Sequence, residues 1–265
     1  MQRNPNKDKI LKTMRKLCRR HSPWTVFGDF VEMCALSVAN SVSQGSSEWE
    51  AREKRYLEVI GKYQPDEQKE FPAMFADLVG AMQYALTWEN APADILGKLF
   101  HELELHNRWS GQFFTPQHIC DFMGKIVLGE PKDQIEKHGF VSCCEPCSGS
   151  GALILGFARA MLDEGFNYCS QLVVEATDID IKCVHMTYLQ LSLYGIPATV
   201  MHGNALTLEE WSRWHTPVYI IHGWRWKRRR AAIADKTGEV PPKTEEAPET
   251  AKPAEPMGQL SLFDL

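Results

Sequence analysis

The chain has 265 residues, of which 44% are hydrophobic and 24% are charged, a composition typical of a globular protein with one large domain or two small ones. The formal net charge of −5 excludes a nucleic-acid footprint over the whole surface, so any such contact has to come from local basic patches. The apolar runs fall short of the roughly 18 residues of a membrane span, and no signal peptide is expected at the basic N-terminus.

The first part of the chain is predicted to be helical. Three stretches carry apolar residues at helical spacing, and none alternates apolar and polar residues as a strand would. They cover residues 29–42, 75–88 and 93–106, with Asp29 as a possible helix cap. We therefore expect an all-α N-terminal domain over residues 1–107.

Residues 108–235 change to alternating strand and helix patterns. Short apolar runs predict strands at residues 140–144, 172–177 and 197–202, and amphipathic patterns predict helices at residues 151–165 and 181–195. A short helix is expected over residues 208–215, followed by a fourth apolar strand that begins at Val218. Alternation of this kind favours an α/β domain with a parallel sheet, whose ligand lies at the carboxyl ends of the strands.

The last 30 residues have a different composition. Residues 236–258 are rich in Pro, Glu, Lys, Thr and Ala and lack apolar periodicity, which predicts a disordered linker. The linker leads into the apolar sequence QLSLFDL at residues 259–265. Apolar residues after a polar tether have no core to enter, so this tail is interpreted as a docking motif.

The segment CCEPCSGSGAL, Cys143 to Leu153, could hold a metal, a phosphate group or another cofactor. No second pair of ligands accompanies Cys144 and Cys147, so no metal site is expected, and the eight cysteines favour reduced thiols in the cytoplasm. Gly151 is not followed by the Lys of a nucleotide-binding loop, and Ile154 replaces the third Gly of the dinucleotide fingerprint. A strand, an acidic residue with Pro, and Gly-x-Gly before a helix favour S-adenosylmethionine.

Three further motifs occur with this loop in a fixed order: GQFFTP at residues 111–116, DID at 178–180 and GNAL at 203–206. The ordered set resembles the adenine-N6 DNA methyltransferases, in particular the modification subunits of type I restriction-modification systems. The resemblance covers roughly residues 94–206 and implies a Rossmann-like S-adenosylmethionine methyltransferase fold. Because few strands are predicted after residue 206, the expected sheet is a truncated one.

The resemblance implies roles for individual residues. Phe114, Thr115 and Pro116 would contact the methionine end of S-adenosylmethionine, and the loop residues Glu145, Pro146, Gly149 and Gly151 would lie beneath it. Asp178 would accept hydrogen bonds from the ribose hydroxyls, and Asn204 would lie at the adenine amine. From the residues alone, Asp178 could instead cap the next helix, and Asn204 could be a turn residue.

The family's catalytic tetrapeptide, Asn or Asp-Pro-Pro-aromatic, is absent from this chain. One alignment places TPVY there, with Thr216, Pro217 and Tyr219 as catalytic candidates. The other treats VYII as the fourth strand and places HGW, with His222 and Trp224, at the catalytic corner; the expected strand order favours this second alignment.

Two C-terminal segments predict partners. The sequence GWRWKRRRAA combines tryptophans with the cations Arg225, Lys227, Arg228, Arg229 and Arg230, which suits contact with DNA but also a solvated helix end. The tail resembles the bacterial sliding-clamp-binding motif, with Gln259, Leu260, Leu262 and Phe263 as the binding residues. That resemblance implies a bacterial, phage or plasmid setting, in which the linker holds the protein near DNA.

These motifs predict an S-adenosylmethionine-dependent, DNA adenine-N6 methyltransferase-like protein that is tethered to replicating DNA through the sliding clamp. Because the catalytic tetrapeptide is missing, enzymatic activity stays open. The alternatives are a degenerate module that binds cofactor, DNA and clamp without methyl transfer, and an interaction subunit that needs a specificity or catalytic partner chain.

Overall fold

The structure is a computed structural model that describes residues 4–103, 105 and 114–237. The chain divides into two compact units, Met1–Trp224 and Arg225–Leu265. No helix in the described ranges is both long enough and apolar enough to cross a membrane. The domain boundaries at residues 107, 235 and 258 stay predictions.

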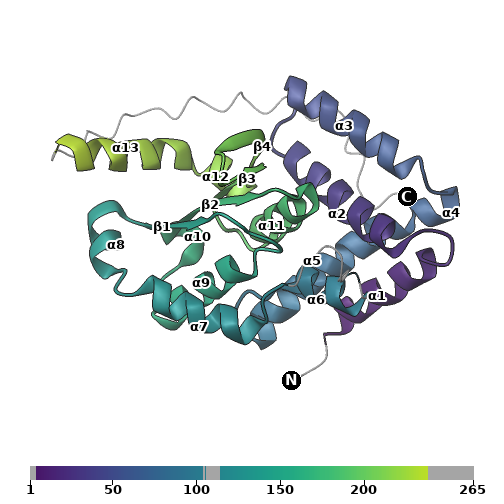
Figure 1. The fold of residues 1–265 in the computed structure, drawn as a ribbon, viewed down its shortest axis with the longest axis horizontal. Helices are drawn as coiled ribbons and strands as arrows, with labels where there is room; N and C mark the ends of the chain where they lie inside the picture. Colours follow the sequence, from purple (N-terminus) through teal and green to yellow (C-terminus); the bar gives the residue numbers. More distant parts are fainter. Residues whose placement is uncertain (1–3, 104, 106–113, 238–265) are drawn as a thin grey trace, which may run out of the picture. The chain divides into compact units, whose positions relative to one another are not determined.

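Helices form the N-terminal part of the first unit, as predicted (Figure 1). Their apolar faces bury side chains such as Ile10, Phe27 and Leu78. The helices are α1 (Pro5–Leu17), α2 (Pro23–Asn40), α3 (Ser47–Ile60), α4 (Pro65–Gln68), α5 (Glu70–Trp88) and α6 (Ile95–Glu102).

The prediction that Asp29 caps a helix is wrong. Helix α2 begins at Pro23, whose fixed φ suits a first helical turn, so Asp29 lies inside the helix. Its buried carboxylate accepts hydrogen bonds from the Tyr63 hydroxyl at 2.9 Å and the Lys62 ammonium at 3.2 Å. Asp29 therefore joins α2 to the segment that follows α3.

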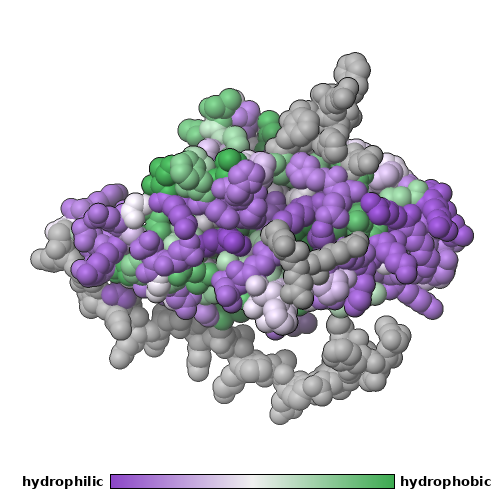
Figure 2. Space-filling model, turned by 90° about the horizontal axis from the view of Figure 1, so that it is seen from below, coloured by the Kyte–Doolittle hydropathy of each residue, from purple (hydrophilic) through white to green (hydrophobic). Residues whose placement is uncertain are grey.

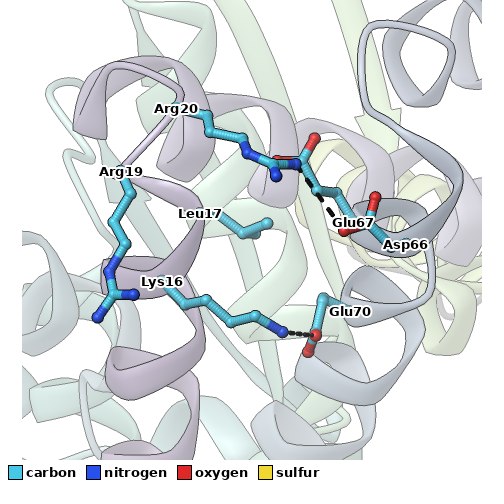
Figure 3. Close-up of a pocket in the computed structure, with 7 residues that line it drawn as sticks. All are labelled: Lys16, Leu17, Arg19, Arg20, Asp66, Glu67 and Glu70. Carbon is cyan, nitrogen blue, oxygen red and sulfur yellow. Dashed lines mark hydrogen bonds and ion pairs between the residues drawn. The ribbon is translucent and has the colours of Figure 1, made fainter.

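Ion pairs surround the C-terminal end of α1. Lys16 pairs with Glu70 at 2.6 Å and Arg20 with Glu67 at 3.4 Å, while Leu17 lies buried between them (Figure 3). These side chains line a small cavity of about 160 Å³. Because the cations and carboxylates pair with each other, this cavity is explained by packing of α1 against α4 and α5.

A four-stranded sheet forms the other part of the first unit, with the order β1-β2-β3-β4. The first three strands are parallel, and β4 runs antiparallel to β3. The strands are β1 (Val141–Glu145), β2 (Leu172–Asp178), β3 (Ala198–Asn204) and β4 (Glu209–His215). The predicted α/β fold with a helical N-terminal region is confirmed.

Helices connect the parallel strands. Along the chain, helix α9 (Ala152–Asp163) and the short α10 (Tyr168–Gln171) connect β1 to β2, and α11 (Ile181–Leu193) connects β2 to β3 (Figure 1). Helix α2 packs against α11, so the N-terminal helices and the sheet share one core. Helices α7 (Gln117–Leu128) and α8 (Lys132–His138) precede β1.

Helix α7 packs closely on α9 through glycines. A Cβ atom added at Gly156 would lie in the backbone of Cys120, which shows that the two helices approach without intervening side chains. The outer side of α7 exposes Phe122, Ile126 and Val127. Figure 2 shows hydrophobic patches, in green, among the hydrophilic residues of one face, in purple.

The predicted order of elements after β3 is wrong. Residues 209–215 form the strand β4 instead of a helix, because they pair with the open edge of β3 and bury Trp214 against His185 and Tyr188. The run VYII lies in α12 (Pro217–Ile221) instead of a strand. Pro217 lacks a ladder N–H and suits a helix start, and a short apolar run cannot by itself separate strand from helix.

Helix α13 spans Trp224–Thr237. Its first residue, Trp224, belongs to the first unit, and the rest of the helix belongs to the second. The predicted basic residues lie along this helix, and the Arg229 guanidinium is 6.0 Å from the centre of the Trp226 ring. The arrangement is a short basic helix with an aromatic side chain among its cations.

Candidate cofactor site

The loop between β1 and α9 has a backbone that needs glycine. Gly149 and Gly151 have φ values of 55° and 90°, in the left-handed region that side chains disfavour. Gly151 is the N-cap of α9, where no side chain bonds the first N–H groups of the helix. These N–H groups, together with the helix dipole, can receive a carboxylate or another anion.

Asp178 joins this loop to the end of β2. Its Oδ2 accepts a hydrogen bond of 2.8 Å from the Gly149 N–H, and its Oδ1 accepts one of 2.9 Å from the Asp180 N–H. Burial raises the pKa of the Asp178 carboxyl, while these N–H donors lower it. Asp180, and not Asp178, is the N-cap of α11, so the capping alternative does not apply to Asp178.

Glu145 ends β1 and shapes the start of the loop. Its Oε1 accepts a hydrogen bond of 3.0 Å from the Cys147 N–H, across Pro146. Cys144 and Cys147 are exposed, and burial raises the pKa of the Cys143 thiol to about 12. In the described ranges, no group of three His, Cys, Asp or Glu side chains is placed to hold a metal.

Phe114 lies against the loop from the segment before α7. Its ring centre is 4.8 Å from that of Phe100, and a Cβ atom added at Gly149 would lie 3.2 Å from its Cδ1. Thr115 is exposed, and Pro116 is the N-cap residue of α7. The structure therefore brings Phe114 to the glycine loop, while residues 111–113 of the motif lie outside the described residues.

Asn204 ends β3 on the same edge of the sheet as Asp178. The strand register pairs Asp178 with His202, two residues before Asn204. The Oδ1 of Asn204 accepts hydrogen bonds from the N–H groups of Leu206 at 2.9 Å and Thr207 at 3.3 Å. Asn204 thus shapes a turn, as the alternative drawn from the residues alone had it.

Sequence reasoning missed several residues at this edge. Ile179 and Leu206 are 61% and 95% exposed, and they follow directly or closely on the polar strand ends. Thr187, inside α11, donates a hydrogen bond of 3.0 Å to the Gly149 carbonyl. The available signal was a polar residue on the buried side of a predicted helix, and apolar residues in a predicted turn.

The structure does not bring the catalytic candidates to this edge. Thr216 is fully buried; its hydroxyl accepts from the Ala198 N–H and donates to the Ile196 carbonyl, both at 2.9 Å, at the opposite end of β3. Tyr219 stacks on His215 with ring centres 4.8 Å apart.

Two candidates follow α12. Trp224 is fully buried against Phe140, while His222 is exposed. Because residues 209–215 are a strand, TPVY directly follows a strand, as in the alignment that the sequence disfavoured. The clamp-binding candidates Gln259, Leu260, Leu262 and Phe263 lie outside the described residues.

Comparison with known proteins gives a family match over much of the chain. A family model described as N-6 DNA Methylase matches residues 94–244. No curated protein matches the chain.

Two solved structures are similar in part. The type I restriction-modification methyltransferase subunit from Streptococcus thermophilus has 19% identity and a TM-score of 0.38, over 72% of this chain and 41% of its own. A putative class I S-adenosylmethionine-dependent methyltransferase from Listeria monocytogenes has 14% identity and a TM-score of 0.36, over 75% of this chain and 70% of its own. This chain thus spans about two fifths of the length of the first structure.

Proposed function

The chain belongs to the N-6 DNA methylase family, and on this basis we propose that it binds S-adenosylmethionine at residues 145–151 and serves adenine-N6 methylation of DNA. One observation carries this proposal: the Gly149 N–H bonds the Asp178 carboxylate, which unites the glycine loop with the end of β2. A parallel sheet binds ligands at this edge.

The residues present fit this cofactor. Gly149 and Gly151 allow the loop its positive φ values, and the N-terminus of α9, which no side chain caps, favours the cofactor's carboxylate. Asp178 offers acceptor oxygens to the ribose hydroxyls, and Asn204 would lie at the adenine end of the cofactor. The methionine end would pack on Phe114, Thr115 and Pro116. When bound, S-adenosylmethionine supplies an activated methyl group for transfer to a nucleophile.

A second candidate function is binding of cofactor and DNA without methyl transfer. The buried hydroxyl of Thr216 favours it, since its hydrogen bonds go to backbone groups of Ile196 and Ala198 at the start of β3. The third candidate is an interaction subunit, whose site a separate catalytic or specificity chain would complete. The first unit would then act as the cofactor-holding part of an assembly.

We propose that DNA contacts lie on α13, through Arg225, Lys227, Arg228, Arg229 and Arg230. Cations on one helix with Trp226 among them suit phosphate contacts and base stacking. The proposed tail motif, through Gln259, Leu260, Leu262 and Phe263, would tether the protein to a bacterial sliding clamp in the cytoplasm. The setting would be a bacterium, or a phage or plasmid within one. This part of the proposal rests on the sequence.

The test combines cofactor titration with a methylation assay. Asp178→Asn should weaken S-adenosylmethionine binding about ten- to a hundredfold, because a charged acceptor is removed. Asp180→Asn is the matched control, since Asn caps a helix as well as Asp and should leave affinity unchanged.

The outcomes separate the two functions. Labelled methyl transfer to adenine in DNA of mixed sequence supports the enzyme, and cofactor binding without transfer by the purified chain supports the binding module. Absence of S-adenosylmethionine binding by the wild-type chain would contradict both.

A further inference from the structure

Asp94 lies next to the glycine loop, although it is far from the loop in sequence. It is the N-cap of α6, is 6% exposed, and accepts a 2.7 Å hydrogen bond from the Gly97 N–H at its Oδ1. Its Oδ2 accepts a 2.7 Å hydrogen bond from the hydroxyl of Ser150, the residue between the two loop glycines. The carboxylate that begins α6 thus also holds the middle of the loop.

Gln190 completes this network from α11. Its Nε2 donates to the Asp94 Oδ1 at 2.9 Å and to the Ser150 carbonyl at 2.7 Å. Its Oε1 accepts from the N–H groups of Ile95 at 2.9 Å and Leu96 at 3.2 Å. Gln190 is fully buried, so a broken bond here leaves a polar group without water.

These bonds set the direction of the loop backbone. The Gly149 carbonyl accepts from Thr187 on α11, and the Ser150 carbonyl accepts from Gln190 on the same helix. In a trans peptide the next N–H points opposite to the carbonyl, so the Ser150 N–H is directed away from α11. Thr187 and Gln190 therefore fix the directions of both peptide groups that join the loop glycines.

We infer that Asp94 and Gln190 are positioning residues that hold Ser150 and thereby preset the Gly149–Gly151 loop for its ligand. The identity of that ligand rests on the proposed function, whereas the preset loop is a property of the chain without ligand. Preorganisation of this kind raises affinity because the loop is ordered before binding.

The test measures the loop with and without cofactor. Ser150→Ala and Gln190→Met are compared with the wild type by hydrogen exchange of the peptide covering residues 146–153, and by calorimetric titration with S-adenosylmethionine. We expect exchange of this peptide to rise about tenfold and cofactor affinity to fall about tenfold in both variants.

Two further variants separate positioning from general stability. Tyr63→Phe also removes a hydroxyl that donates to a buried carboxylate, that of Asp29, and should leave loop exchange and cofactor affinity unchanged. Asp94→Asn keeps an acceptor for Gly97 and can donate to the Ser150 hydroxyl, so it should retain most of the protection.

Each result decides one question. Unchanged loop exchange in Ser150→Ala and Gln190→Met, or an equal rise in Tyr63→Phe, would overturn the inference. Faster loop exchange with unaltered cofactor affinity would also overturn it. Faster loop exchange in a protein whose wild type fails to bind S-adenosylmethionine would uphold the positioning role and refute the proposed ligand.

Discussion

Gly149 lies against the ring of Phe114, so closely that a Cβ atom at position 149 would be 3.2 Å from Cδ1 and 3.3 Å from Cε1. Phe114 is in turn held by Phe100 of α6. Glycine is therefore required at position 149 for two reasons: its φ is 55°, and the aromatic ring leaves little space for a side chain.

Gly149→Ala should destabilise the protein by about 2–3 kcal/mol and weaken S-adenosylmethionine binding, because backbone strain adds to the clash with Phe114. Gly129 offers a matched control, since its φ is 54° and no atom lies within 4 Å of an added Cβ. Gly129→Ala should cost only the backbone strain, about 1–2 kcal/mol, and leave cofactor binding intact. Urea denaturation and calorimetry measure both effects, and equal destabilisation in the two variants would contradict the role of Phe114.

His185 predicts a pH dependence of stability. Its ring is buried 5.0 Å from that of Trp214, and burial lowers its pKa from the ordinary 6.5 to about 4. Between these values the unfolded chain binds more protons than the folded chain, so stability rises with pH from about 4 to about 6.5 and is lost as pH falls. The full effect is of the order of 3 kcal/mol.

His185→Leu should flatten the stability curve between about pH 4 and 6.5, as measured by urea denaturation at a series of pH values. The exposed His118 provides the control, and His118→Gln should keep the wild-type slope. A slope that persists in His185→Leu would assign the pH dependence to other groups.

The basic helix α13 predicts a salt-dependent interaction with DNA. Replacing the exposed Arg225 and Arg229 by Ser should weaken binding to duplexes of any sequence, and should reduce the slope of log affinity against log salt by about 0.9 for each DNA phosphate that is no longer neutralised. Replacing the exposed Lys12 and Arg19 by Ser changes the net charge equally at the N-terminal helices. Equal weakening in both double variants would show a general charge effect instead of a site on α13.

The C-terminal tail predicts capture by a bacterial sliding clamp. Changing Leu262 and Phe263 to Ala should abolish binding in a pull-down or surface-based assay, because these are the apolar anchors of the proposed motif. Ser261→Ala alters the residue just before the anchors and should leave binding intact. Capture that survives the double change would rule out this interpretation of the tail.

Local patterns in the sequence were sufficient to predict the alternating core of the first unit. Helices at α9 and α11 and strands at β1, β2 and β3 were predicted, because apolar periodicity and glycine turns are local signals that these segments obey. The motifs that follow the predicted strands also indicated which edge of the sheet holds the candidate cofactor site. That inference did not depend on long-range packing. These features depend on residues that are neighbours in the chain.

The remaining features depend on tertiary structure. Residues 209–215 became a strand because β3 offered them an open edge, and Thr216 became a buried link because it meets Ala198 there. Ser150 is fixed by Asp94 and Gln190, which are 56 and 40 residues away in the chain. Pairings over such distances leave no periodic trace in a single sequence, because they arise only when packed elements bring buried polar groups together.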